Sequence, residues 1–286
     1  DIGHTPFGHA GERILSSLYQ EHTGRYFNHN VHSVRVLDDM VNWNISLQTL
    51  DGILCHNGEL ELKEYRPCEM STFVEYDEKV EACYVDENAI AELIPCTLEG
   101  CVMRICDIIA YLGKDRQDAM RLNLLKESPF TAGAIGTTNG EIINNFSVNI
   151  IENSYGKDYL KMDEEYFDAL RQAKKENYEM IYNNKSLNDL YENEIRPMFG
   201  ELYEELLRQA ESGDKSSVFY RHHMAYMEKN NFYVKSHVRK PYAEQEKNQL
   251  VVDYLASMTD DYFIALYHYL FPKGKHDVKF VGYFDL

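Results

Sequence analysis

Histidines with glycine and acidic neighbours are concentrated at the beginning of this 286-residue sequence. Residues 1–12 read D-I-G-H-T-P-F-G-H-A-G-E and place His4 and His9 five positions apart. The glycines and the proline around them predict a tight turn that fixes both imidazoles, because Gly3 and Gly8 permit close backbone approach and proline suits a first helical turn. Fixed imidazoles can donate or accept protons near neutral pH.

His9 and Glu12 are three residues apart, so they share a face of a helix that begins near Pro6. A carboxylate that hydrogen-bonds one ring nitrogen orients the imidazole and stabilises its charged form. The pair therefore predicts general acid or base chemistry.

A second group of histidines lies in F-N-H-N-V-H-S, residues 27–33. We expect His29 and His32 at the start of a helix that Asn28 or Asn30 caps. A histidine at this place is often only a neighbour of the cap, and for His32 helix packing and a functional role are equally open.

A third polar group lies in D-I-I-A-Y-L-G-K-D, where Asp107, Tyr111 and Asp115 recur every four residues. On a helix they line one face over about 12 Å. Because isoleucines flank this stripe, it is predicted to point into a cleft or towards a partner.

The elements that position these groups are predicted to be helices. Apolar residues recur at three- and four-residue steps, which is typical of core-facing helices, and convincing strand alternation is scarce. Clusters of glycine and polar residues predict loops at Thr131–Gly140 and Glu211–Ser217. The helical patterns cover Glu12–Tyr19, Asn30–Val41, Arg104–Met120, Glu141–Glu152, Asp163–Tyr182 and Leu250–Leu270.

Composition narrows the class of protein. The net charge of −18 argues against broad nonspecific binding to nucleic acid or acidic membranes, so a polyphosphate would need a metal ion and a few focused cations. No run is long and apolar enough for a membrane span. The six cysteines form no CxxC pair, and we expect reduced buried thiols, with a structural zinc site at Cys96 and Cys101 as the alternative.

Five segments together resemble the HD-domain deoxynucleoside triphosphate triphosphohydrolase (dGTPase-like) family. Residues 1–12 are similar to its HD motif, except that the histidine expected before Asp1 is missing. F-N-H-N resembles the family's F-E-H-N motif. The stripe resembles the family's signature D-D-I-A-Y-x-x-x-D-x-x-D-A, except that Ile108 stands where the family often has a second acid. Residues 137–140 and 252–260 are similar to later landmarks. The resemblance implies an all-α HD-domain phosphohydrolase fold with additional C-terminal helices.

The resemblance also implies roles for individual residues. Two histidines and two aspartates hold a divalent metal in the family, and motif matching assigns Asp1 and Asp107 as the carboxylate ligands. Both histidine ligands would then lie upstream, so we expect the sequence to begin within its own metal site. The donor types suit Mn²⁺, Mg²⁺, Fe²⁺, Ni²⁺ or Zn²⁺.

In the same interpretation His9, oriented by Glu12, is the general acid for the departing 5′-oxygen, and His4 with His29 contacts phosphate oxygens. Tyr111 and Asp115 face the sugar. A carboxylate there can accept the 3′-hydroxyl, and a close ring can exclude a 2′-hydroxyl.

The predicted function is metal-dependent hydrolysis of a deoxynucleoside triphosphate, dGTP by family analogy, to a deoxynucleoside and inorganic triphosphate. The alternatives are an HD phosphohydrolase of another nucleotide, a monophosphate or an alarmone, and a degenerate HD protein that senses nucleotides. We expect a catalytic core at residues 1–150, helices packed on it at 151–286, a cytoplasmic location and a homo-oligomer.

Overall fold

The computed structural model describes residues 1–41, 43–57, 61–122, 124–125, 130–131, 133–230 and 241–278. These residues form twelve α-helices, short π-helical and 3₁₀ turns, and two strands of two residues each. The predicted all-α class is therefore confirmed. No helix in these ranges combines the length and apolar character needed to cross a bilayer.

Packing divides the chain into two compact units. Unit 1 comprises Asp1–Ile45, Val80–Glu87 and Asp189–Leu286, and unit 2 comprises Ser46–Lys79 and Asn88–Asn188. The expected boundary near residue 150 separates a catalytic region from a C-terminal region, which a division by packing does not test. It stays a prediction.

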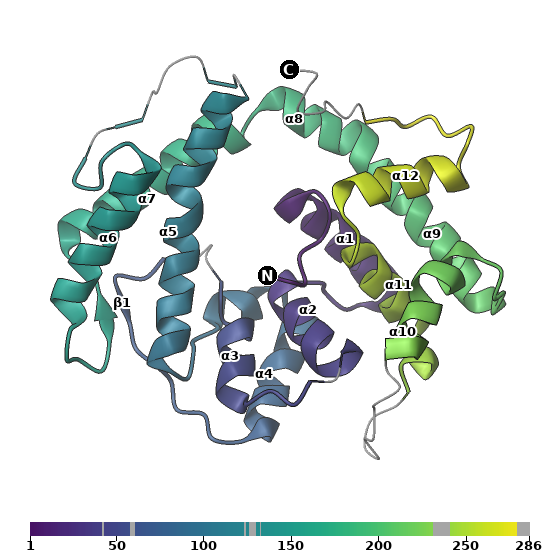
Figure 1. Ribbon diagram of the computed structural model, residues 1–286, viewed down its shortest axis with the longest axis horizontal. Helices are drawn as coiled ribbons and strands as arrows, with labels where there is room; N and C mark the ends of the chain where they lie inside the picture. The colour runs from purple at the N-terminus through teal and green to yellow at the C-terminus, as the bar shows by residue number, and fades with distance from the viewer. Residues whose placement is uncertain are drawn as a thin grey trace. The chain divides into compact units, whose positions relative to one another are not determined.

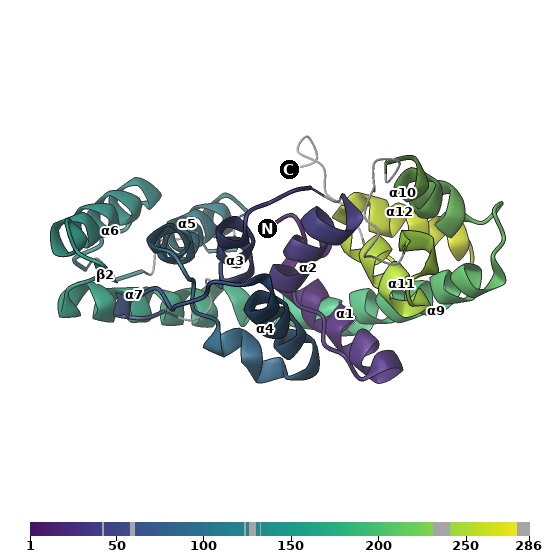
Figure 2. The same ribbon diagram turned by 90° about the horizontal axis from the view of Figure 1, so that it is seen from below.

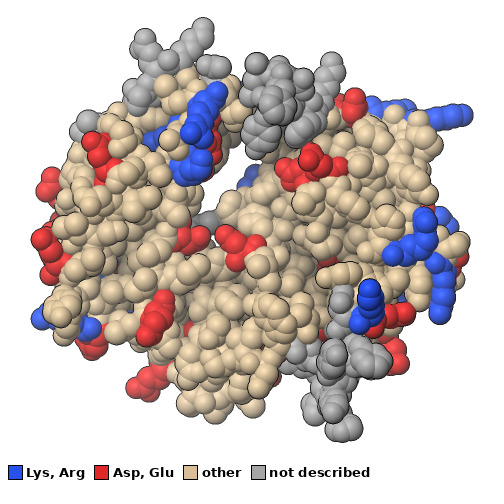
Figure 3. Space-filling model, viewed as in Figure 1, with Lys and Arg blue, Asp and Glu red and all other residues tan. Residues whose placement is uncertain are grey.

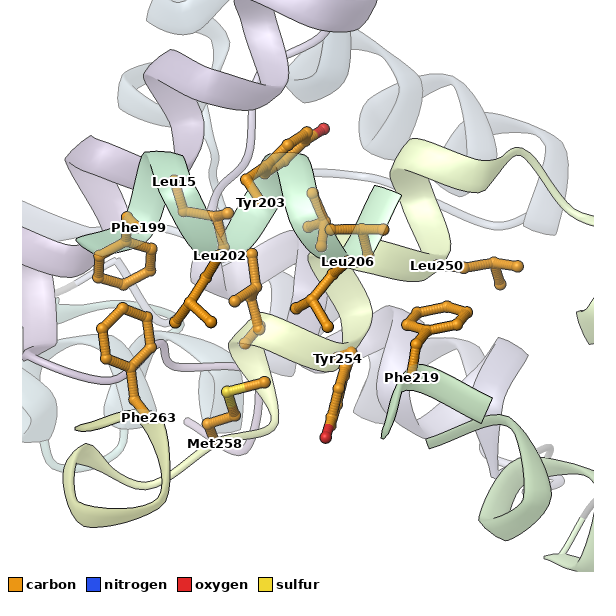
Figure 4. Packing of buried hydrophobic residues seen from close by; sticks show 14 of the residues in the cluster. Leu15, Phe199, Leu202, Tyr203, Leu206, Phe219, Leu250, Tyr254, Met258 and Phe263 are labelled. Carbon is orange, nitrogen blue, oxygen red and sulfur yellow. The ribbon is translucent and has the colours of Figure 1, made fainter. Parts of the chain in front are cut away.

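Unit 1 is built around three helices, α1 (Gly8–Thr23), α9 (Arg196–Ser212) and α11 (Lys247–Ala256), which pack against one another. Figure 4 shows side chains of this core, among them Leu15 and Leu202, which are fully buried. Burying each such leucine contributes roughly 1.5–3 kcal/mol. The other elements of unit 1, several of them visible in Figure 2, are α2 (His29–Arg35), the end of α4 (Phe73–Val85), α10 (Ala225–Asn230), α12 (Asp260–Leu270), π-helical turns at Val36–Met40, Tyr191–Ile195 and Phe219–Met224, and a 3₁₀ turn at Tyr242–Glu244.

Local sequence sets the ends of the helices in unit 1 that matter for function. Asn28 caps α2 by accepting the Asn30 N–H, as predicted. Gly24 ends α1 in the left-handed conformation, and its N–H donates to the Gln20 carbonyl. Thr259 caps α12 by accepting the Tyr262 N–H.

Unit 2 is organised by α5 (Leu98–Arg121), which packs along α6 (Asn139–Ser154) and α7 (Glu164–Asn177), as Figure 1 shows. Buried residues Ile105, Ile108 and Leu112 form the apolar face of α5. The remaining elements of unit 2 are α3 (Leu47–Leu54), most of α4, most of α8 (Lys185–Leu190), a 3₁₀ segment at Glu87–Glu92, a π-helical turn at Tyr178–Tyr182, and strands β1 (Glu64–Tyr65) and β2 (Leu160–Lys161), which pair antiparallel with Glu64 opposite Lys161.

The predicted helical segments are confirmed, with changes at their ends. The segment predicted as one helix over Leu250–Leu270 is two helices, because Thr259 caps α12 and interrupts the run. The helix predicted over Asn30–Val41 continues from α2 as a π-helical turn. The predicted loop Thr131–Gly140 already enters α6 at Asn139, and its residue 132 lies outside the described residues.

All six cysteines are free thiols, as expected, but they are not uniformly buried. Cys55, Cys83 and Cys101 are buried, whereas Cys106 is exposed on the outer face of α5. Among the described residues, Cys96 and Cys101 belong to no group of three or more side chains that could hold a metal. The alternative of a zinc site at these two residues gains no support.

Candidate active site

A sharp turn precedes α1 and separates His4 from His9. Phe7 has a φ of 62° and Gly8 a φ of 57°, so two consecutive residues are left-handed. The helix therefore begins at Gly8 rather than near Pro6. An added Cβ at Gly8 would contact nothing within 4 Å, so the predicted close approach of another backbone segment is absent at this residue. Its positive φ explains why a glycine stands here.

Gly3 does show the predicted close approach. A Cβ at this position would lie 2.2 Å from the Ser33 backbone nitrogen, and the Gly3 N–H donates to Ser33 Oγ at 3.0 Å. The N-terminal segment of unit 1 is thereby held directly against α2, the helix that begins with His29.

Glu12 is the centre of the site, and it binds two imidazoles rather than the one that we predicted. His9 Nδ1 lies 3.0 Å from Glu12 Oε2, and His29 Nδ1 lies 2.9 Å from Oε1, which also accepts the His29 backbone N–H at 2.8 Å. Burial alone would raise the pKa of Glu12, but the hydrogen bonds from His29 and His9 outweigh it and hold this pKa well below its usual range. An ionised Glu12 accepts both Nδ1 protons and leaves both Nε2 atoms for other partners.

The imidazoles lie close together at the start of α1 and α2. The His4 ring centroid is 5.0 Å from that of His9 and 4.7 Å from that of His29. Burial lowers the pKa of His4, and the neighbouring His29 and His9 lower it further. The side chain of His9 is 49% exposed and that of His29 is 9% exposed, so His9 is the more accessible proton carrier.

The donor set of unit 1 fits a divalent metal in its chemistry. Ligand atoms of His4, His9, Glu12 and His29 lie within 4.8 Å of one another, and imidazole with carboxylate suits first-row divalent ions. Both oxygens of Glu12 already accept imidazole N–H groups, which fits orientation of the rings better than ligation. The Asp1 carboxylate is 64% exposed, with Oδ1 3.8 Å from His29 Nε2, and it fits a ligand role.

Asp107, Tyr111 and Asp115 belong to unit 2. All three are half-buried on α5 at the predicted four-residue spacing, so the polar stripe is confirmed as a helix face. The Tyr182 hydroxyl donates to Asp115, and burial together with this carboxylate raises the pKa of Tyr182. The structure thus gathers Asp1, His4, His9, Glu12 and His29 in unit 1, and the stripe in unit 2.

A buried polar network in unit 1 was not assigned a role from the sequence. Asp253, fully buried on α11, accepts Arg35 Nε at 2.7 Å, Arg35 Nη2 at 2.6 Å and the Tyr242 hydroxyl at 2.9 Å. His32, whose role was left open, is buried with Nδ1 3.8 Å from Asp253, and His223 accepts or donates a hydrogen bond with Tyr242. The signal in the sequence was an acid inside the apolar run L-V-V-D-Y-L-A, because a buried charge needs a partner.

Known proteins resemble this chain in sequence. Residues 160–269 match the family model described as a phosphohydrolase-associated domain. Over 95% of its length the chain is 26% identical to a deoxyguanosinetriphosphate triphosphohydrolase-like protein of Caldanaerobacter subterraneus, and over 95% it is 25% identical to one of Desulfatibacillum aliphaticivorans. The chain is thus similar over most of its length to proteins named as deoxyguanosinetriphosphate triphosphohydrolase-like. These alignments cover 65% and 68% of the two relatives.

A third member of this group, from Rhodopseudomonas palustris (strain BisB5), is 34% identical over 148 residues, which are 47% of this chain and 36% of the relative. The segment matched by the phosphohydrolase-associated model begins at β2 and ends within α12. It therefore contains the buried Asp253 and the start of α12.

Proposed function

We propose that this chain carries the histidine site of a metal-dependent HD phosphohydrolase that hydrolyses deoxynucleoside triphosphates to a deoxynucleoside and inorganic triphosphate. The observation that carries the proposal is Glu12 bound to the Nδ1 atoms of His9 and His29, beside His4. The relatives named as deoxyguanosinetriphosphate triphosphohydrolase-like proteins support the substrate class and make dGTP the first substrate to test.

The chemistry of this reaction explains the need for an acid. The departing 5′-oxygen would leave as a strongly basic alkoxide unless it received a proton. His9 can supply that proton from Nε2, because ionised Glu12 occupies Nδ1 and stabilises the positive charge of an imidazolium. His4 and His29 contact phosphate oxygens in this proposal.

Asp1 and Asp107 are the proposed carboxylate ligands of a divalent metal, which when bound would activate water and neutralise the polyphosphate. The residues of this chain would do the remaining work of placing the nucleotide. Tyr111 and Asp115, half-buried on one face of α5, are proposed to face the sugar. In this proposal the Asp115 carboxylate, which accepts the Tyr182 hydroxyl, also accepts the 3′-hydroxyl of the sugar.

Surface charge supports focused rather than diffuse binding of a polyphosphate. The net charge is −18, and Figure 3 shows the described acidic and basic side chains scattered over the face that it draws. Such a surface favours recognition by a metal and a few imidazoles over a broad basic patch. A homo-oligomer and a cytoplasmic location stay predictions, and light scattering at micromolar concentration would test the first.

The decisive experiment measures inorganic triphosphate released from dGTP, the other dNTPs and GTP by the natural full-length protein, with Mn²⁺, Mg²⁺, Fe²⁺, Ni²⁺ or Zn²⁺ added separately. We expect metal-dependent release from dNTPs but not from GTP. Asp107→Ala should abolish both activity and metal content, whereas Glu99→Ala, an exposed acid on the same helix, should not.

Other outcomes would redirect the assignment. Turnover of a monophosphate or an alarmone in place of dNTPs would favour an HD phosphohydrolase of another nucleotide. Nucleotide binding without turnover under every metal would favour a sensor. Full activity and unchanged metal content in Asp107→Ala would contradict the metal assignment.

A further inference from the structure

The turn between His4 and His9 is held in a conformation that its sequence disfavours. Among the non-glycine residues that the structure describes, only Phe7 has a positive φ, at 62°. An aromatic residue rarely adopts the left-handed region, and such strain persists only where surrounding contacts impose it. The contacts around Phe7 therefore show what fixes this turn.

One of these contacts comes from the start of α12, more than 250 residues later in the sequence. Asp260 Oδ1 accepts the Phe7 backbone N–H at 2.8 Å. Both residues belong to unit 1. This N–H precedes the helix and has no carbonyl partner within α1, so the carboxylate satisfies a donor that would otherwise depend on water.

The Phe7 ring is fixed by the same part of unit 1. Its centroid lies 5.3 Å from that of Phe263, at an interplanar angle of 88°, and 6.2 Å from that of Phe199. Phe263 is fully buried on α12, one turn after Asp260. A backbone bond and an edge-to-face ring contact thus reach Phe7 from a single helix.

The conformation of Phe7 controls the direction in which the chain enters α1. The Phe7 carbonyl accepts the Gly11 N–H at 3.2 Å, and the Thr5 hydroxyl donates to the Gly8 carbonyl at 3.2 Å. His4 lies three residues before Phe7 and His9 two residues after it, so a rotation at Phe7 changes the placement of one imidazole relative to the other. A small displacement of this kind is enough to slow a reaction that depends on aligned groups.

The presence of an acid at position 260 also has a simpler explanation, and the neighbouring Asp261 serves as a control for it. An acid in the first turn of a helix is favoured by the helix dipole whatever else it contacts. Asp261 shares that position and that charge, and it is likewise exposed. Only Asp260 is bonded to Phe7.

We propose that Asp260 is a positioning residue: through its bond to the Phe7 N–H it keeps the left-handed turn in place and sets the placement of His4 relative to His9. It does not touch the substrate. Asp260 and Phe263 both lie within the segment that matches the phosphohydrolase-associated model, so this segment contributes a direct contact to the histidine turn. The kinetic part of the proposal rests on the proposed function, and the structural part does not.

The test compares four forms of the natural full-length protein, namely wild type, Asp260→Ala, Asp260→Asn and Asp261→Ala. Imidazole ¹H–¹⁵N spectra report the environments of His4 and His9, and triphosphate release from dGTP gives kcat and KM. We expect Asp260→Ala to shift both sets of imidazole resonances and to lower kcat by roughly 10- to 100-fold, with KM changed by less than about threefold. Asp260→Asn keeps an Oδ1 acceptor and should restore most of kcat, and Asp261→Ala should match wild type in every readout.

The two readouts separate failure of this proposal from failure of the proposed function. If the wild type hydrolyses no dNTP, the proposed function fails, while imidazole shifts confined to Asp260→Ala still support the positioning role. Unchanged spectra and unchanged kcat in Asp260→Ala, or equal losses in Asp260→Ala and Asp261→Ala, would overturn it. If Asp260→Ala does not fold, Asp260→Glu replaces it in the test, because this variant retains the charge but displaces the acceptor oxygen. It must show the same imidazole shifts in weaker form. Wild-type spectra in Asp260→Glu would overturn the proposal.

Discussion

Two carboxylates of unit 1 lie in comparable surroundings but serve different partners. Glu12 is 8% exposed and Asp253 is fully buried, and each accepts several hydrogen bonds. Hydrogen bonds and charge outweigh burial in both, so that the pKa of Glu12 falls well below its usual range and that of Asp253 falls to about 2. Glu12 holds the first residue of α2, His29, and Asp253 holds the last, Arg35.

The difference lies in what the partners can do. Arg35 keeps its proton at all relevant pH values and is itself buried, so its pair with Asp253 can only fix structure. Glu12 instead binds two imidazoles, and that of His9 is 49% exposed. A buried carboxylate therefore indicates a reactive site only when a partner can both exchange a proton and reach a ligand.

Replacing His9 should give the largest effect and should confine it to chemistry. We expect His9→Ala to lower the chemical step by about 10²- to 10⁴-fold, the usual contribution of a positioned acid, while metal and nucleotide binding persist. Single-turnover kinetics with dGTP measure this. A substrate analogue with a good phenolate leaving group needs little protonation, so the variant should cleave it nearly as well as wild type does. Equal impairment on that analogue would make His9 a phosphate or metal contact and pass the role of acid to His29 or a bound water.

Replacing Asp253 should instead affect stability. Asp253→Ala removes the buried counter-ion of the Arg35 guanidinium and leaves it only the partly exposed Asp39, which costs about 3–5 kcal/mol of unfolding free energy. Urea unfolding at neutral pH measures the loss, and Asp261→Ala, an exposed acid in unit 1, should stay within about 0.5 kcal/mol of wild type. A loss below about 1 kcal/mol in Asp253→Ala would mean that the network does not support the fold.

Acid should weaken the Asp253 network before Asp253 itself is protonated. Burial lowers the pKa of both His32 and His223 from 6.5 to about 4. In the unfolded chain these two histidines bind protons from about pH 6.5 downwards, whereas in the folded chain they stay neutral until about pH 4. Their contribution to stability is therefore fully present above pH 6.5 and is lost as the pH falls towards 4. The largest loss of unfolding free energy from this effect is about 3 kcal/mol for each histidine. Urea unfolding at pH 7.5 and pH 4.5 measures the loss, which should be smaller in His32→Gln; an unchanged pH dependence there would contradict the assignment to His32.

Glu12→Gln should give the smallest effect of the four. A glutamine has one acceptor oxygen, so it can bind only one of the two Nδ1–H groups and carries no charge to stabilise an imidazolium. We expect kcat to fall by about tenfold, less than in His9→Ala, with a changed pH–rate profile. A loss as large as that of His9→Ala would show that Glu12 does more than orient and charge the rings.

Periodicity and motif order were enough to predict the all-α class, the helices and the pairing of His9 with Glu12, because these depend on short spacings. The second bond of Glu12, to His29, was missed because it joins residues 17 positions apart, one on α1 and the other on α2. The Arg35–Asp253 pair and the Asp260–Phe7 bond were missed for the same reason, since each joins segments more than 200 residues apart. The left-handed Phe7 had no signal at all, because its own side chain disfavours that conformation.

The interleaving of the two units has a consequence for the order in which the protein can fold as it is synthesised. Unit 2 ends at Asn188, so all of its residues are synthesised before those of α9, α11 and α12. At 5–20 residues per second, roughly ten seconds or longer pass between the synthesis of His4 and His9 and the synthesis of α9 and α11, which pack against α1. During that interval the apolar face of α1 is exposed, and a chaperone that binds amphipathic helices would find its target there.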